Sequence, residues 1–168
     1  MEAVDAPTRD PIELAHGNWV AAGWVDAADG MALVTSIMRV QQLLLARVEA
    51  LLRPRGLTFA RFEVLRLLAF SRTGELPVGK VGERLQVHPA SVTNAVQRLE
   101  EDGHVARRTN PRDGRSVLAT ITPRGRALVD DCTTLLNEHV FADMPIDDAD
   151  LGATRAVMDH LRRRLDAD

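Results

Sequence analysis

The residues from 88 to 103, HPASVTNAVQRLEEDG, constrain the fold of this chain more than any other stretch. Pro89 suits the first turn of a helix, where its missing N–H would have no partner in any case. Gly103 suits the position just past the end, where a left-handed backbone costs glycine little. Between them apolar residues recur at helical spacing and form one stripe: Val92, Ala95, Val96 and Leu99. The stretch predicts a helix that packs one face against the rest of the protein and leaves the opposite face exposed to solvent.

The presented face of this helix carries short hydrogen-bonding side chains and one cation. Asn94 and Gln97 lie at its centre, and the residues that flank them are Ser91, Thr93 and Arg98. Side chains of these types read base edges in the major groove of DNA and hold phosphates. An ordinary surface helix is also polar outside, so the neighbouring segments have to decide between the two interpretations.

Those segments predict a helix-turn-helix followed by a β-hairpin. Residues 77–86 form a short helix with Val78, Val81 and Leu85 inward, and two residues join it to the next helix. Residues 105–109 and 116–121 are compatible with strands, and the sequence NPRDGR between them is rich in turn-forming residues. The hairpin has a basic tip, which is typical of a wing.

Further helices are expected on both sides of this block. Apolar spacing predicts a long helix over 30–52 and others over 59–71, 123–142 and 147–165, with Thr58 as a plausible N-cap. The long helix carries more apolar surface than one small domain needs, which indicates a partner chain. Residues 11–28 predict a helical extension interrupted by Gly17 and Gly23, with Trp19 and Trp24 as the only tryptophans.

Charge and composition narrow the class of protein. The net charge is −3, yet residues 105–126 hold six arginines against one aspartate, a local charge of +5 that would steer a polyanion. No apolar run approaches the ~20 residues of a membrane-spanning helix, and the acidic N-terminus does not resemble a secretory signal. A single cysteine, Cys132, fits a reducing compartment. We therefore expect a cytoplasmic protein that does not bind a membrane.

The order of these elements, with the sequence LQVHPASVTNAVQRLEEDGHVARRTNPRDGRSVLATITPRGRAL, resembles the MarR family of winged-helix transcription regulators. The resemblance covers roughly residues 30–165 and is most specific over 77–126. It implies a mainly α fold with a small β-hairpin wing and flanking dimerisation helices. The expected divisions are a mobile tail (1–10), the extension (11–28), dimerisation helices (29–57 and 123–168) and a winged helix-turn-helix domain (58–122).

The resemblance also implies a function, that of a homodimer on a pseudo-palindromic operator in double-stranded DNA, most often a repressor released by a small ligand. In this interpretation the helix over 88–103 contacts the major groove, and we call it the reading helix. Its expected DNA contacts are Ser91, Thr93, Asn94, Gln97 and Arg98. Arg115 matches a wing arginine that enters the minor groove, and Asp113 matches an acidic partner that would orient its guanidinium. The expected phosphate contacts are Arg107, Arg108 and Arg112. Asp113 could instead be a plain turn residue.

Members of the family commonly bind an effector between the long helix, the 59–71 helix and the DNA-binding lobe. The residues available there are Trp19, Trp24, Met38, Arg39, Phe59, Phe62 and Arg66. Aromatic walls with arginines suit an aromatic acid or an acyl ligand, for example an acyl-coenzyme A. The same aromatic residues could instead pack the core or the dimer.

Other classes of function find less support in the sequence. We expect no cofactor and no metal site, since Cys132 and His139 lie about 10.5 Å apart along one helix and no HExxH or CxxC motif occurs. No nucleotide fingerprint or nucleophile motif points to an enzyme. A redox-sensing regulator acting through Cys132 and a winged-helix module that binds proteins instead of DNA are the alternatives. The basic wing argues against the second of these.

Overall fold

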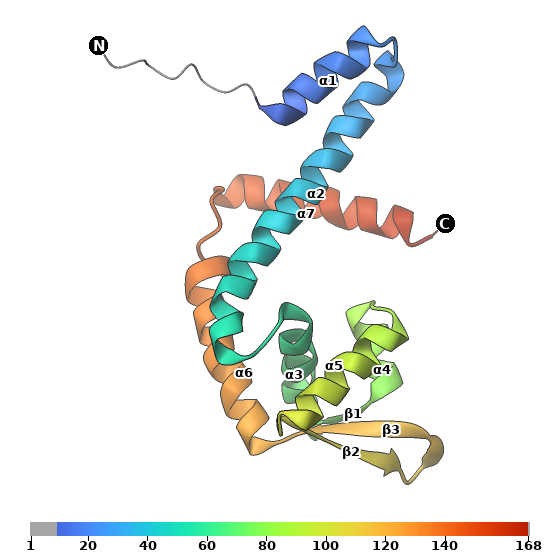
Figure 1. Cartoon of the computed structure of the whole chain (residues 1–168), viewed down its shortest axis with the longest axis vertical. Helices are drawn as coiled ribbons and strands as arrows, with labels where there is room; N and C mark the ends of the chain where they lie inside the picture. The colour runs from blue at the N-terminus through green and yellow to red at the C-terminus, as the bar shows by residue number, and fades with distance from the viewer. Residues whose placement is uncertain (1–9, 168) are drawn as a thin grey trace, which may run out of the picture. The chain divides into compact units, whose positions relative to one another are not determined.

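The computed structural model describes residues 10–167 of the chain, in two compact units that meet between Ala50 and Leu51. The tail expected over 1–10 lies outside the described residues except for Asp10. That residue caps the first helix, because its Oδ1 accepts the backbone N–H of Ile12 at 2.9 Å. Figure 1 colours the chain from blue at the N-terminus to red at the C-terminus.

The first unit is a helical hairpin. Helix α1 (Pro11–Ala21) and helix α2 (Val25–Leu52) are joined by a tight turn in which Gly23 has a φ of 88°. The expectation that Gly17 interrupts the extension is wrong, because Gly17 lies inside α1. The long helix begins at Val25 instead of Gly30, since the turn that ends α1 is complete one residue earlier, at Trp24.

Helix α2 leaves a long apolar face exposed to solvent. More than a third of the surface is open on its large side chains Leu33, Val34, Met38, Val40, Leu43 and Leu45. The segment Val25–Arg55 contains an 18-residue window with a mean hydropathy of 1.2, so by length and composition alone it could cross a membrane. This corrects the sequence-based expectation that no segment comes near that threshold. An apolar face of this size marks an interaction surface.

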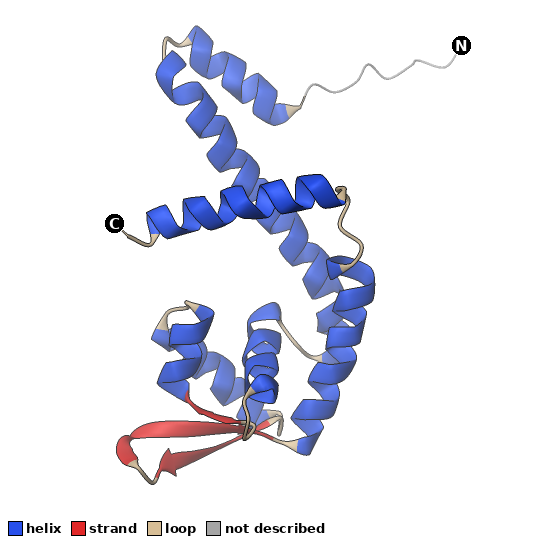
Figure 2. Ribbon diagram, turned by 180° about the vertical axis from the view of Figure 1, so that it is seen from behind, coloured by secondary structure: helices blue, strands red, loops and turns tan. Residues whose placement is uncertain are grey.

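The second unit holds the helices α3 to α7 and a small sheet. Its elements are η1 (Arg53–Arg55), α3 (Phe59–Phe70), β1 (Glu75–Pro77), α4 (Val78–Leu85), α5 (Pro89–Glu101), β2 (Val105–Asn110), β3 (Asp113–Ile121), α6 (Pro123–Leu136), η2 (Asn137–Phe141) and α7 (Asp148–Leu165). The fold is mainly helical with one small antiparallel sheet, as expected. In Figure 2 the three strands, in red, lie together along one edge of this unit.

The sheet has the order β1-β3-β2, and both of its pairings are antiparallel. Strand β1 was not expected, because three residues are too few to show an alternating pattern. The wing turn is also tighter than the sequence indicated, since Asn110 pairs with Asp113 and only Pro111 and Arg112 lie between the strands. Asp113 and Arg115 therefore lie on β3 and not in the loop.

The core of this unit is made where α3, α4, α5 and α6 meet the sheet. Its fully buried side chains include Leu65, Leu68, Val81, Val96, Leu99 and Val129. The helix expected over 123–142 ends as an α-helix at Leu136 and continues as a π-helical turn. Just before that change Thr133 and Thr134 donate their hydroxyls to the carbonyls of Val129 and Asp130, a pattern that bends helices.

Candidate nucleic-acid interface

Helix α5 is held firmly by its buried face and by both of its ends. Val92, Val96 and Leu99 are almost fully buried. At the start, His88 accepts the N–H of Ala90 on its Nδ1 at 3.2 Å, a cap that the sequence analysis did not identify. At the end, Gly103 takes a φ of 75°, as expected from its position. The backbone of α5 is thus fixed, so its outer side chains start from defined positions.

The five residues predicted to contact DNA from α5 are all exposed: Ser91, Thr93, Asn94, Gln97 and Arg98. Thr93 donates its hydroxyl to the carbonyl of Pro89 at 2.9 Å, and so retains only acceptor capacity toward a ligand. Gln97 and Arg98 both bond to Glu101, each at 3.0 Å. The polar face exists as expected, but two of its members already have an intramolecular partner.

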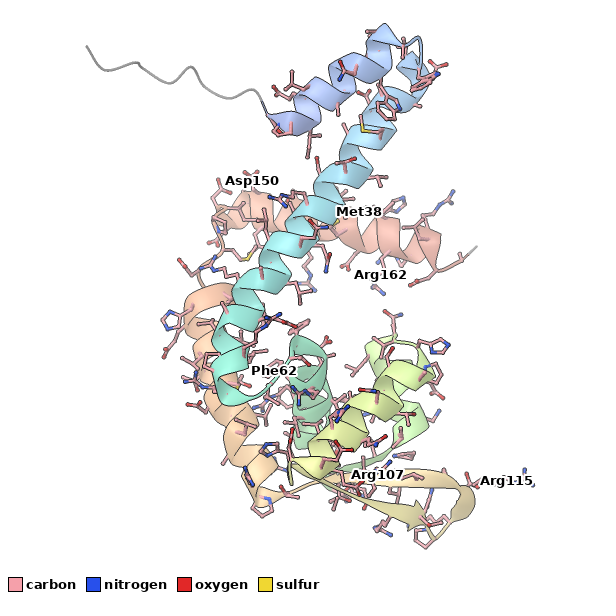
Figure 3. All side chains as sticks on the ribbon, viewed as in Figure 1. Met38, Phe62, Arg107, Arg115, Asp150 and Arg162 are labelled. Atoms are coloured by element: carbon pink, nitrogen blue, oxygen red, sulfur yellow. The ribbon has the colours of Figure 1, made fainter. Side chains whose placement is uncertain are left out.

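The wing presents two arginines at its tip. Arg112 lies in the turn, Arg115 lies near the start of β3, and both side chains are exposed. Figure 3 shows Arg115 at the tip of the wing. Among residues 10–167, neither guanidinium forms an ion pair. Asp113 accepts the backbone N–H of Arg115 at 3.1 Å and leaves its guanidinium alone. The expectation that Asp113 orients that guanidinium is therefore not met in the unbound chain, where Asp113 shapes the turn.

The two strand arginines behave differently from those at the tip. Arg107 forms an ion pair with Glu100 at the end of α5. Arg108 donates hydrogen bonds from Nε and Nη2 to the carboxylate of Glu75 at 2.9–3.1 Å. The Thr120 hydroxyl donates to the same carboxylate at 2.7 Å. The Thr120 hydroxyl, together with Arg108, lowers the pKa of Glu75. Arg108 thereby joins β2 to β1 across β3, a role that competes with a phosphate contact.

A groove of about 620 Å³ runs between the first turn of α3 and the outer face of α5. Its walls include Ser91, Asn94 and Arg98, three of the residues predicted to contact DNA, together with Thr58 and Arg61. From the sequence, Thr58 was predicted only as an N-cap, and Arg61 was not predicted to be a site residue. Arg61 bonds to Asp102, 41 residues away, and no local pattern reveals that proximity.

The residues predicted to bind an effector fall in both units. In the first, Trp19 and Trp24 pack edge to face with their ring centroids 5.4 Å apart, and Trp24 is 57% exposed. In the second, Phe62 is buried and stacks on Phe59. Arg66 bonds Asp130 at 2.6 Å and covers the Phe70 ring. For Phe62 the structure supports the alternative of core packing, whereas Phe59 is half-buried.

The described residues offer little support for redox or metal chemistry. Cys132 is fully buried, and this burial raises the pKa of its thiol, which lowers the fraction of reactive thiolate. Within residues 10–167, no group of three or more His, Cys, Asp or Glu side chains is placed to hold a metal ion. These observations do not favour the redox alternative.

Comparison with known proteins agrees with this geometry. Residues 55–116 match the model of the MarR family. The transcriptional repressor Rv2887 of Mycobacterium tuberculosis is 38% identical over 101 residues, which span 60% of this chain and 71% of that protein. The relatives matched are transcriptional regulators, not enzymes.

Solved structures show the same relationship. Sco5413, a MarR family transcriptional regulator from Streptomyces coelicolor, is 49% identical, superposes with a TM-score of 0.75, and is matched over 83% of this chain and 96% of its own. Sco3205 of the same organism, solved in complex with DNA, shares the fold with a TM-score of 0.72 at 21% identity, over 82% of this chain and 88% of that one. The wing, the reading helix and these similarities lead to one conclusion: the chain belongs to the MarR family of DNA-binding transcription regulators.

Proposed function

We propose that this regulator is a cytoplasmic homodimer that binds a pseudo-palindromic operator and represses transcription until a small aromatic or acyl ligand releases it. The observation that carries the DNA-binding part is the exposed polar face of α5 beside a wing with two unpaired arginines. Ser91, Asn94, Gln97 and Arg98 enter the major groove, and Thr93 stays at its edge as an acceptor. Arg115 enters the minor groove.

Phosphates are the second part of this assignment. Arg112 is exposed and available to a phosphate, and Asn110 Oδ1 accepts its backbone N–H at 3.0 Å and so holds the turn that presents it. Glu100 already pairs with Arg107 and Glu75 with Arg108, so each of these arginines offers less net charge to a phosphate. We therefore expect Arg112 to contribute more to affinity than either strand arginine.

A substitution of Arg115 tests this interface. A duplex is first selected from random sequence by the purified full chain, and its affinity is then measured by fluorescence anisotropy at several salt concentrations. Arg115→Ala should weaken binding by about 1–3 kcal/mol. Arg155→Ala removes the same charge from the exposed face of α7 and serves as the control. Equal losses in the two variants, or none in Arg115→Ala, would refute the minor-groove role.

The exposed apolar face of α2 supports the homodimer. Two copies give a twofold arrangement in which the two reading helices lie about one helical turn of DNA, ~10 bp, apart. Asp29 and Arg39 interrupt the face, so a second protein chain suits it better than lipid does. Leu43→Glu should therefore yield monomers in analytical ultracentrifugation, whereas Val117→Glu, on the exposed side of β3, should leave the dimer intact.

We assign effector binding to side chains of the first unit. Trp19, Trp24 and Met38 offer apolar surface, and Arg39 offers a cation for a carboxylate or phosphate. Phe59, Phe62 and Arg66 lie in the second unit, where Phe62 is buried and Arg66 bonds to Asp130, so the residues of the first unit carry this part of the proposal. Titration of tryptophan fluorescence with benzoate and with an acyl-coenzyme A, read beside operator release, tests this. Quenching without release would indicate binding that does not control DNA affinity.

A further inference from the structure

The C-terminal end of α5 carries three consecutive acidic residues, Glu100, Glu101 and Asp102. Acidic groups at this end of a helix oppose the helix dipole and lower helix stability. They would also repel the phosphates of bound DNA. A reading helix that ends in this way departs from local rules of stability, and such departures are expected where a residue serves function.

Each of the three carboxylates holds a different arginine. Glu100 pairs with Arg107, and Asp102 with Arg61 at 3.1 Å. Those two contacts join α5 to other elements. Glu101 is different, because both of its partners, Gln97 and Arg98, lie on the outer face of α5 itself.

The geometry at Glu101 fixes the orientation of a base-reading amide. Its Oε1 accepts Gln97 Nε2 at 3.0 Å, while its Oε2 accepts Arg98 Nη1 at 3.0 Å. Because a carboxylate only accepts hydrogen bonds, the amide atom of Gln97 that faces it has to be the nitrogen. One N–H of Gln97 is thereby used. The second N–H and the carbonyl oxygen remain available.

Those two remaining groups are the ones that recognise adenine. A glutamine binds adenine by donating to N7 and accepting from the N6 amino group. An amide that rotates freely presents its oxygen and nitrogen in either order and has to be ordered on binding. The carboxylate of Glu101 also occupies Arg98, which reduces the attraction of this face for phosphates of any sequence.

We propose that Glu101 is a positioning residue that sets base specificity: it orients the Gln97 amide for adenine and restrains Arg98 from sequence-independent binding. The proposal rests on the proposed function, because it takes Gln97 and Arg98 as DNA contacts. Glu101 acts through those side chains and touches no base itself.

The experiment compares two affinities for each variant of the full chain. The probes are the duplex selected by the wild-type protein and a scrambled duplex of the same composition, measured at one salt concentration. Glu101→Ala should bind the scrambled duplex several-fold more tightly. The ratio of the two dissociation constants should fall about tenfold, because one bidentate base contact discriminates by ~1–3 kcal/mol. Glu101→Gln can donate as well as accept a hydrogen bond, so it no longer dictates which atom of the Gln97 amide faces it and should lower the ratio as well.

Two controls separate positioning from a general effect of charge. Glu83→Ala removes another exposed carboxylate, which pairs with Lys80 on α4 at the same i+3 spacing, and it should leave the ratio unchanged. In a Gln97→Ala background, Glu101→Ala should lower the ratio by much less than it does in the wild type, because only the part that runs through Arg98 remains. Additive losses in that double variant would overturn the proposal.

The outcomes also distinguish a failure of the role of Glu101 from a failure of the proposed DNA-binding function. A wild-type protein that selects no sequence and binds no duplex refutes the DNA-binding function. A wild-type protein that selects a motif, with Glu101→Ala keeping the ratio within twofold, refutes only the role of Glu101. Loss of a preference for cytosine, in place of adenine, would show that Glu101 contacts a base directly and would equally overturn the proposal.

Discussion

The junction between the wing and α6 leaves no room for a single methyl group at Gly125. A Cβ built there would lie well inside 3.0 Å of the carbonyl oxygen of His104, and 3.0 Å from its carbonyl carbon. All of the atoms in conflict belong to the backbone, so no side-chain rotation relieves the overlap. The first turn of α6 would have to move away from His104 by roughly 1 Å, on the scale at which one added methyl group is felt in a packed interior.

The cost of that movement can be worked from the contacts it breaks. Overpacking of this kind costs about 1–3 kcal/mol. The same carbonyl of His104 accepts the backbone N–H of Thr122 at 3.0 Å, and losing that bond adds ~1 kcal/mol. Alanine in a helix returns up to ~1 kcal/mol relative to glycine. Gly125→Ala should therefore destabilise the protein by about 2 kcal/mol, which lowers the melting temperature by ~4–8 °C for a chain of this size.

The assay is thermal unfolding followed by circular dichroism, with wild type and variants at one protein concentration. Gly152→Ala is the matched control, since a Cβ there meets nothing within 4 Å inside α7. It should raise the melting temperature slightly through helix propensity alone. A Gly125→Ala protein that melts at or above the wild-type temperature would refute the steric reasoning.

Three further predictions follow from side-chain contacts. The hydrogen bond from Thr120, supported by Arg108, lowers the pKa of Glu75, so its stabilisation is present above the unfolded pKa of ~4.3 and is lost as the pH falls through the folded value. Glu75→Gln should thus flatten the acid side of a stability–pH profile measured by urea unfolding. Arg108→Ala should lower the unfolding midpoint and leave the salt dependence of DNA binding unchanged, whereas Arg112→Ala should reduce the salt slope by about one and leave stability unchanged. Peroxide should not release the protein from DNA, because Cys132 is buried, and a Cys132→Ala variant should respond as the wild type does in the same gel-shift assay.

The sequence predicted the reading helix well because its determinants are local. Pro89 and Gly103 mark its ends, and the buried stripe falls at helical spacing. The wing was predicted for the same reason, since a run of turn residues separates two β-compatible segments. These signals act within a few residues of one another, and the tertiary structure does not override them.

The ion-pair partners of the arginines could not be predicted from the sequence, because they depend on how distant segments pack together in the fold. Arg108 meets Glu75 from 33 positions away, through a three-residue strand that leaves no pattern. Arg61 meets Asp102 across 41 positions. The contact of Glu101 is the exception, since its spacing of three and four from Arg98 and Gln97 could have been read on the helix face.

The junction at His104 has a consequence for how the wing can move. Only Thr122 separates β3 from α6, and its hydroxyl bonds the carbonyls of Gly103 and His104, so the strand and the helix meet without a hinge. From Ile121 to Arg115 the strand forms a lever arm of six residue steps, ~20 Å at about 3.3 Å each. Moving as one piece with α6 through roughly 10°, it carries Arg115 by ~3.5 Å, close to the ~3.4 Å between successive base pairs. A rotation of that size would displace Arg115 by about one base-pair spacing, without refolding any loop.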